Sequence, residues 1–156
     1  MKYKGEKVSG RSSVIIPIPR DGGDIVFVAQ AIKGWEEFER TVPEPKPPKI
    51  LMAGGKTSED KNDPVYLTEV TKYNEKRTHF MVIRSLAATP DLEWETVDLE
   101  KSETWGNYET ELKDADFSIM EINRIVQGVM RANCLDEEMI DEARRAFLAG
   151  QQGSGQ

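Results

Sequence analysis

The sequence predicts an α+β fold: an N-terminal β-hairpin, a proline-rich arm, and then a mainly helical domain of about four helices. Two β-branched runs flank an Asp-Gly-Gly turn, four prolines follow within six residues, and apolar residues then recur at helical spacing. We divide the chain into a hairpin region (1–42), an arm (43–62), a helical domain (63–150) and a disordered tail (151–156).

The hairpin is predicted from β-branched runs at residues 14–19 and 25–32. Asp21-Gly22 between them is typical of a tight turn, because glycine adopts the positive φ angles that such turns require. Pro17 lacks the N–H that a sheet needs, so the first strand is expected at a sheet edge. The second strand is apolar on both faces and needs cover on each, from this chain or a partner. Its edge leaves open β-augmentation and a homo-oligomer formed through strand 25–32.

The arm is dominated by prolines at its start and by glycine and polar residues after residue 52. Its proline content favours extended polyproline II and excludes helix and central strand for residues 41–49. A phosphate-binding loop would need the pattern G-x-x-x-x-G-K-[ST] ending at Gly55-Lys56-Thr57, but Ile50 stands where its first glycine belongs. We therefore interpret Gly54-Gly55 as a flexible turn in an arm without packed structure.

A long helix is predicted over residues 64–88. Asp63 is a favourable N-cap, and Pro64 suits the first helical position. Aromatic and apolar residues then recur at helical spacing. We expect the helix to end before Thr89-Pro90, because the residue that precedes a proline disfavours helix.

Two shorter helices are predicted next. Ser102 can cap the first of them, whose buried face would include Trp105. Ser118 and Glu121 form a capping box for the second, in which each side chain accepts a hydrogen bond from an otherwise unpaired backbone N–H. This second helix is expected to end at Asn133.

The last predicted helix carries an apolar stripe that includes Ile140 and Phe147. Asp136 can cap it, with Leu135 and Ile140 as a hydrophobic staple. Gly150 is expected to end it, because glycine is common just past the end of a helix.

The charge of the chain is −7, and it is unevenly distributed. Residues 1–90 carry 15 basic and 12 acidic side chains, whereas residues 91–150 carry 6 basic and 16 acidic ones. The negative charge argues against nucleic-acid or membrane-surface binding and favours basic protein partners near the C-terminal third. With neither a membrane-length apolar run nor a signal-peptide pattern, an intracellular protein is expected.

Nothing in the sequence assembles a catalytic, cofactor or metal site. One cysteine and one histidine cannot form a Cys/His zinc site. His79 has no nucleophile beside it, and Cys134 is interpreted as a small buried apolar residue. The acids at 136–142 are expected in the first turns of a helix, where they interact favourably with its dipole. Their spacing does not fit a calcium-binding loop. Trp94 and Trp105, which bracket an acidic loop, are expected to anchor the core. We therefore predict a non-enzymatic binding protein.

A series of short segments spans residues 45–150. Its members are Pro47-Pro48-Lys49-Ile50-Leu51, Asp63-Pro64-Val65-Tyr66, Lys76-Arg77, Met81-Val82-Ile83, Leu92-Glu93-Trp94-Glu95, Thr104-Trp105, Glu111-Leu112, Phe117-Ser118, Glu121-Ile122-Asn123, Ala132-Asn133, Leu135-Asp136-Glu137, Ala143-Arg144 and Phe147-Leu148. This pattern resembles the tail assembly chaperones of long-tailed bacteriophages over roughly two thirds of the chain.

The resemblance implies a specific role in virion assembly. Such chaperones bind the hydrophobic tape-measure protein, keep it soluble and extended, and recruit tail-tube subunits that later displace them. It places the protein in the cytoplasm of the infected bacterial host. In many phages a ribosomal frameshift also produces a longer form.

Partly exposed helix stripes could bind tape-measure segments as helix-in-groove contacts. The predicted contact residues come from two helices, and the alternative is that they build the core: Tyr66, Tyr73, Phe80, Ile122, Val126 and Met130. A rival function is a virion structural protein, such as a head–tail connector, tail-completion or decoration subunit. The hairpin and arm would suit a subunit that clips onto its neighbours.

Overall fold

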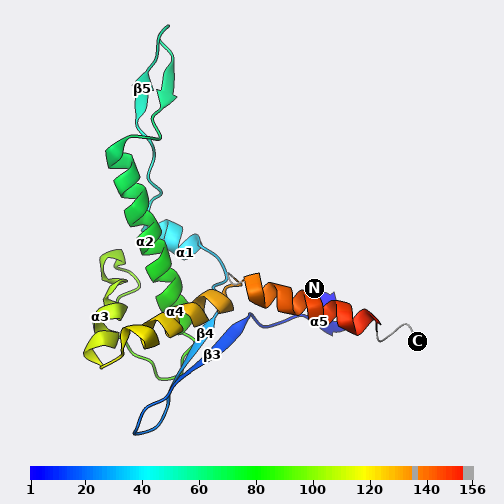
Figure 1. Cartoon of the computed structure of the whole chain (residues 1–156). Coiled ribbons are helices and arrows are strands. Elements are labelled where there is room, and N and C mark those ends of the chain that lie inside the picture. Colours follow the sequence, from blue (N-terminus) through cyan, green and yellow to red (C-terminus); the bar gives the residue numbers. More distant parts are fainter. Residues whose placement is uncertain (135–136, 153–156) are drawn as a thin grey trace.

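Helices and short antiparallel hairpins make up the computed structural model, which describes residues 1–134 and 137–152 (Figure 1). The α+β class is therefore confirmed. In chain order the elements are β1 (Lys2–Tyr3), β2 (Glu6–Lys7), β3 (Ser13–Ile18), β4 (Ile25–Gln30), α1 (Glu36–Thr41), β5 (Lys49–Leu51), β6 (Thr57–Glu59), α2 (Pro64–Leu86), the 3-10 helix η1 (Ser102–Thr104), α3 (Asn107–Asp114), α4 (Ile119–Ala132) and α5 (Glu137–Gln152). The strands pair as β1–β2, β3–β4 and β5–β6.

The predicted hairpin is present as β3–β4, in register from Ser13 opposite Gln30 to Ile18 opposite Ile25. Its connection covers residues 19–24, longer than a two-residue turn, and the predicted Asp21-Gly22 turn lies within it, closed by a hydrogen bond from the Gly23 N–H to the Arg20 carbonyl at 3.1 Å. The Arg20 side chain explains the longer loop, because it packs 4.4 Å from the centre of the Phe117 ring and pairs with Glu121 of α4. The loop must open widely enough to reach these residues.

One face of the β3–β4 hairpin packs against α4. Alternate side chains, Ile16 and Ile18 on β3 with Phe27 and Ala29 on β4, are buried in the core. The helix approaches the strand so closely that a Cβ at Gly128 would lie 2.2 Å from the Cδ1 atom of Ile16. A glycine at this point is therefore a packing requirement.

A cluster of aromatic rings joins α1 to α2 and to the residues before α3. The Phe38 ring on α1 lies 5.2–5.9 Å, centre to centre, from the rings of Trp35, Tyr73, Phe80 and Trp105. Such edge-on and tilted pairs add stability beyond the area they bury. The N-terminal region and the helical domain therefore share one core.

Helix α2 confirms the long helix predicted over residues 64–88. The Asp63 carboxylate accepts a hydrogen bond from the Tyr66 N–H at 2.8 Å, as an N-cap should. Only the last two turns, from Phe80 to Leu86, are buried. The turns of the helix before Tyr73 extend beyond the core and lead toward the β5–β6 hairpin in Figure 1.

The arm contains a hairpin that the sequence did not predict, although all its strand residues are exposed and it does not pack on the core. Lys49 pairs with Glu59 and Leu51 with Thr57 in a two-stranded sheet, which has no central strand. Pairing begins after Pro48, the last proline, because each residue from there can donate an N–H. Gly54 and Gly55, at φ +84° and +74°, confirm the predicted glycine turn.

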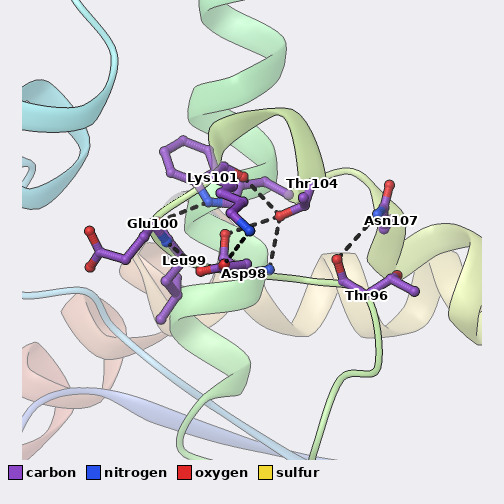
Figure 2. Close-up of polar contacts among 8 residues, drawn as sticks. Thr96, Asp98, Leu99, Glu100, Lys101, Thr104 and Asn107 are labelled. Atoms are coloured by element: carbon purple, nitrogen blue, oxygen red, sulfur yellow. Dashed lines mark hydrogen bonds and ion pairs between the residues drawn. The ribbon is translucent and has the colours of Figure 1, made fainter.

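The segment between α2 and α3 is held by internal hydrogen bonds (Figure 2). The Thr104 hydroxyl accepts from the Asp98 N–H and lies within bonding distance of the Asp98 and Lys101 carbonyls, while the Trp105 indole N–H donates to Leu99. The Ser102 cap is therefore wrong. Ser102 begins η1 without capping it, because Thr104 ties the chain into a tight turn before α3.

Glu111 on α3 bonds the start of this segment, at Glu95 and Thr96, to the helix. Its carboxylate accepts hydrogen bonds from the N–H groups of Glu95 and Thr96, at 2.9 and 2.7 Å, and from the Thr96 hydroxyl. Burial alone would raise the pKa of Glu111, but these hydrogen bonds outweigh it and lower the pKa.

Helix α4 begins and ends where predicted. Ser118 and Glu121 form the capping box, and Asn133 is the C-cap. The Asn133 side chain accepts from the Ile32 N–H and donates to the Ser85 hydroxyl, both at 2.9 Å, so it ties the hairpin to α2. The next residue, Cys134, is exposed at φ +56°, and its predicted burial is wrong because the chain turns outward there.

Helix α5 continues through Gly150 to Gln152, so its predicted end is wrong. Glycine ends a helix when it adopts a left-handed conformation, and Gly150 does not have a positive φ. The predicted cap Asp136 and staple residue Leu135 lie outside the described residues, as does the 153–156 part of the predicted tail.

Replacing Gly128 by alanine should destabilise the protein. The new methyl group would overlap Ile16, and overpacking of this kind costs about 1–3 kcal/mol. Urea unfolding followed by circular dichroism measures the loss. Gly150→Ala is the matched control, because its Cβ would meet no atom within 4 Å and alanine favours helix. An equally stable Gly128→Ala variant would contradict the close packing of α4 on β3.

The Glu111 hydrogen bonds should make part of the stability depend on acid pH. Because folding lowers the pKa of Glu111, its contribution is complete above the unfolded value of about 4.3 and is lost as pH falls through the lower folded value. Glu111→Gln should therefore be less stable than wild type at neutral pH, and urea unfolding should show this gap narrowing near pH 3. A gap independent of pH would exclude the charged carboxylate as its cause.

Candidate protein-binding surfaces

Among residues 1–134 and 137–152, no group of three or more His, Cys, Asp and Glu side chains could hold a metal ion. The His79 ring packs edge-on against Tyr108, 5.8 Å between centres. Burial and the neighbouring Glu109 carboxylate raise the pKa of the Tyr108 phenol, which stays neutral and donates to Glu109. No helix among these residues is long and apolar enough to cross a membrane.

A groove of about 590 Å³ lies where the end of β4 meets α1 and the end of α2. Its lining includes Arg11, Lys33, Glu37 and Arg84. Arg84 pairs with Glu37 at 3.1 Å, and Arg11 donates to the side chain of Gln30 and to a backbone carbonyl. These charges hold the elements together, and their arrangement points to no particular small molecule.

The six predicted contact residues lie at different depths. Phe80 and Ile122 are buried, so a partner could reach them only after a rearrangement. Tyr73, Val126 and Met130 are partly buried and pack against the core. Tyr66 is half-exposed in the first turn of α2, outside that core. The structure therefore spreads them between core and surface and does not gather them into one patch.

Exposed apolar residues instead occur along the arm: on both faces of β5, where Ile50 and Leu51 are consecutive, on Met52 just after it, and on the first turn of α2. We call this set the arm surface: Ile50, Leu51, Met52, Val65 and Leu67. Leu51 is 78% exposed. Tyr66 lies between two of its members in the sequence. In the sequence, this surface is indicated by three consecutive apolar residues, Ile50-Leu51-Met52. All three are exposed in the structure.

A second exposed apolar face lies on β3–β4, opposite the face that packs on α4. We call it the outer sheet face: Ile15, Pro17 and Val26, which are exposed, and Val28, which is half-buried. Ile15 is paired with Val28 and Pro17 with Val26 in the register. The sequence indicated that the second strand is apolar on both faces, and the structure covers only one of them.

The edges of this hairpin are less open than its outer face. Pro17 removes a donor from the β3 edge. On the β4 edge, the Thr89 hydroxyl bonds both the N–H and the carbonyl of Val28, at 2.9 and 3.1 Å. Asn133 accepts from Ile32 just beyond the strand. Pairing of another strand with β4, on which the proposed homo-oligomer through residues 25–32 would depend, would have to displace Thr89.

A third apolar surface runs along α5. Met139 and Ile140 are half-buried, and every side chain described after Asp141 is exposed. We call the apolar face the α5 stripe: Met139, Ile140, Ala143 and Phe147. Phe147 is 60% exposed, and Figure 1 shows α5 leading away from the body.

Comparison with protein-family models, with curated proteins and with solved structures found no match to this chain. The surfaces must therefore be interpreted from their own chemistry.

Thr89→Val should destabilise the protein by removing both bonds to Val28. Valine has a similar shape but leaves the Val28 N–H without its partner, which costs about 1–3 kcal/mol when the group is shielded from water. Thermal and urea unfolding measure the loss, with Thr78→Val on an exposed turn of α2 as the control. Equal losses in the two variants would show that Thr89 has no special role at the β4 edge.

Proposed function

We propose that this chain is a tail assembly chaperone of a long-tailed bacteriophage, acting in the host cytoplasm. It binds the tape-measure protein, keeps it soluble and recruits tail-tube subunits. The sequence pattern over residues 45–150 supports this function by resemblance. The arm surface is the observation that carries it, because it provides a place for an apolar client outside the core.

The arm surface has the properties that client binding needs. Burying a leucine or isoleucine side chain is worth about 1.5–3 kcal/mol, so several exposed together favour association. Lys49, Lys56 and Lys61 are exposed in the same segment and would keep the hairpin soluble before the client binds. The surface also lies on a projecting element, so a long client can bind without opening the aromatic core.

A virion structural protein is the second candidate. Elements that project from a small core also suit a subunit that clips onto neighbours in a particle. Mass spectrometry of purified virions separates the two functions. A chaperone should be missing from finished particles, whereas a connector or decoration subunit should be present in stoichiometric amount.

Co-expression with the tape-measure protein of the same phage tests the chaperone function. The wild-type chain should increase the soluble fraction of the tape measure and co-purify with it. Leu51→Asp should weaken binding by about tenfold or more, because it replaces buried apolar area with a charge. Affinity is measured with the purified chain and a soluble tape-measure fragment.

Met120→Asp is the matched control, because Met120 is 72% exposed on α4, away from the arm. It should bind like wild type. Equal weakening by both substitutions would remove the arm surface as the client site. No effect of the wild-type chain on tape-measure solubility would contradict the chaperone function itself.

A further inference from the structure

Two apolar faces in this chain have complementary shapes, and each is largely exposed. The outer sheet face is a twisted, two-stranded surface, and the α5 stripe is a helix face. A helix laid on a sheet is one of the standard ways in which proteins bury such faces. The six paired residues of the hairpin extend about 20 Å. The twelve residues from Glu137 to Leu148 extend about 18 Å as a helix, so the lengths match.

The charges of the two faces specify one orientation. Three bases, Arg11, Lys33 and Arg84, and two acids, Glu36 and Glu37, line one groove beside the end of the hairpin where β3 begins and β4 ends. Because Arg84 pairs with Glu37, the groove keeps an excess of basic charge. Asp21 and Asp24 lie in the loop at the opposite end, where Arg20 faces Phe117 and α4 instead.

The helix has the reverse distribution along its length. Its first half carries four acids, and two arginines follow them: Glu137, Glu138, Asp141, Glu142, Arg144 and Arg145. With the start of α5 toward Arg11 and Lys33, acids meet bases at one end and arginines approach Asp21 and Asp24 at the other. The opposite orientation would bring like charges together at both ends.

We propose that two copies of the chain associate by exchanging α5, each helix lying on the outer sheet face of the other copy. In the structure α5 leads away from the body instead of lying on its own sheet, which presents the stripe to a second molecule (Figure 1). Reciprocal exchange covers four apolar faces at once and closes the assembly as a two-fold dimer. Since the arm surface takes no part in it, the dimer is independent of the proposed client.

Sedimentation velocity over a range of protein concentrations tests this dimer. The wild-type chain should sediment as a dimer at high concentration. Phe147→Asp on the helix and Ile15→Asp on the sheet should each raise the dimer Kd by about tenfold or more. Ile119→Asp is the matched control, since Ile119 is 68% exposed on α4 against 69% for Ile15, and it should leave the Kd unchanged. Circular dichroism confirms that each variant is folded.

Mixing the two interface variants identifies the contact. A pair made of one Phe147→Asp chain and one Ile15→Asp chain keeps one intact helix–sheet contact, so the mixture should form heterodimers more readily than either variant alone. Arg145→Glu should weaken the wild-type dimer, and Asp24→Arg in the same chain should restore it.

Three results would overturn the proposal. A wild-type chain that stays monomeric at every concentration would exclude the exchange of α5 between copies. The helix would then lie on its own sheet or on no sheet. An Ile15→Asp variant as dimeric as wild type would indicate that α5 pairs with α5. A dimer lost on Ile119→Asp would place the interface on α4.

Discussion

The close contact of α4 with the β3–β4 hairpin is the interaction on which the rest of the structure depends. A two-stranded hairpin is marginal in water by itself, so its apolar face must be covered. The Gly128 backbone allows α4 to approach Ile16, and Asn133 at the end of the helix bonds both the hairpin and Ser85 of α2. One helix therefore joins the N-terminal strands to the long helix, and the aromatic rings around Phe38 complete the same core.

A core of this size cannot cover every apolar face of a 156-residue chain. The arm surface, the outer sheet face and the α5 stripe all remain exposed, and each lies on an element at the margin of the core. Some acids of the C-terminal third have a structural role. The carboxylates of Glu111 and Glu121 accept hydrogen bonds from backbone N–H groups, and Asp98 accepts one from the Glu100 N–H within its loop.

Local signals predicted much of the fold. Asp63 and the Ser118 capping box act within one helical turn, so the sequence is sufficient to place the starts of α2 and α4. Features that depend on distant contacts could not be predicted. Arg20 of the first hairpin loop contacts Phe117 and Glu121, and the first turns of α2 lie outside the core because packing begins only at Tyr73. The same limit applies to the contact residues, since helical spacing places Tyr66 and Phe80 on one stripe without showing which turn is buried.

We propose that one shared core presents apolar surfaces on projecting elements and that the arm binds a client. Hydrogen exchange followed by mass spectrometry, on the chain alone and with the proposed tape-measure client, tests this most directly. We expect the slowest exchange in β3, β4, α4 and the end of α2, and client-dependent protection over the arm hairpin and the first turns of α2. Protection confined to α4 and the buried end of α2, with the arm unchanged, would contradict it.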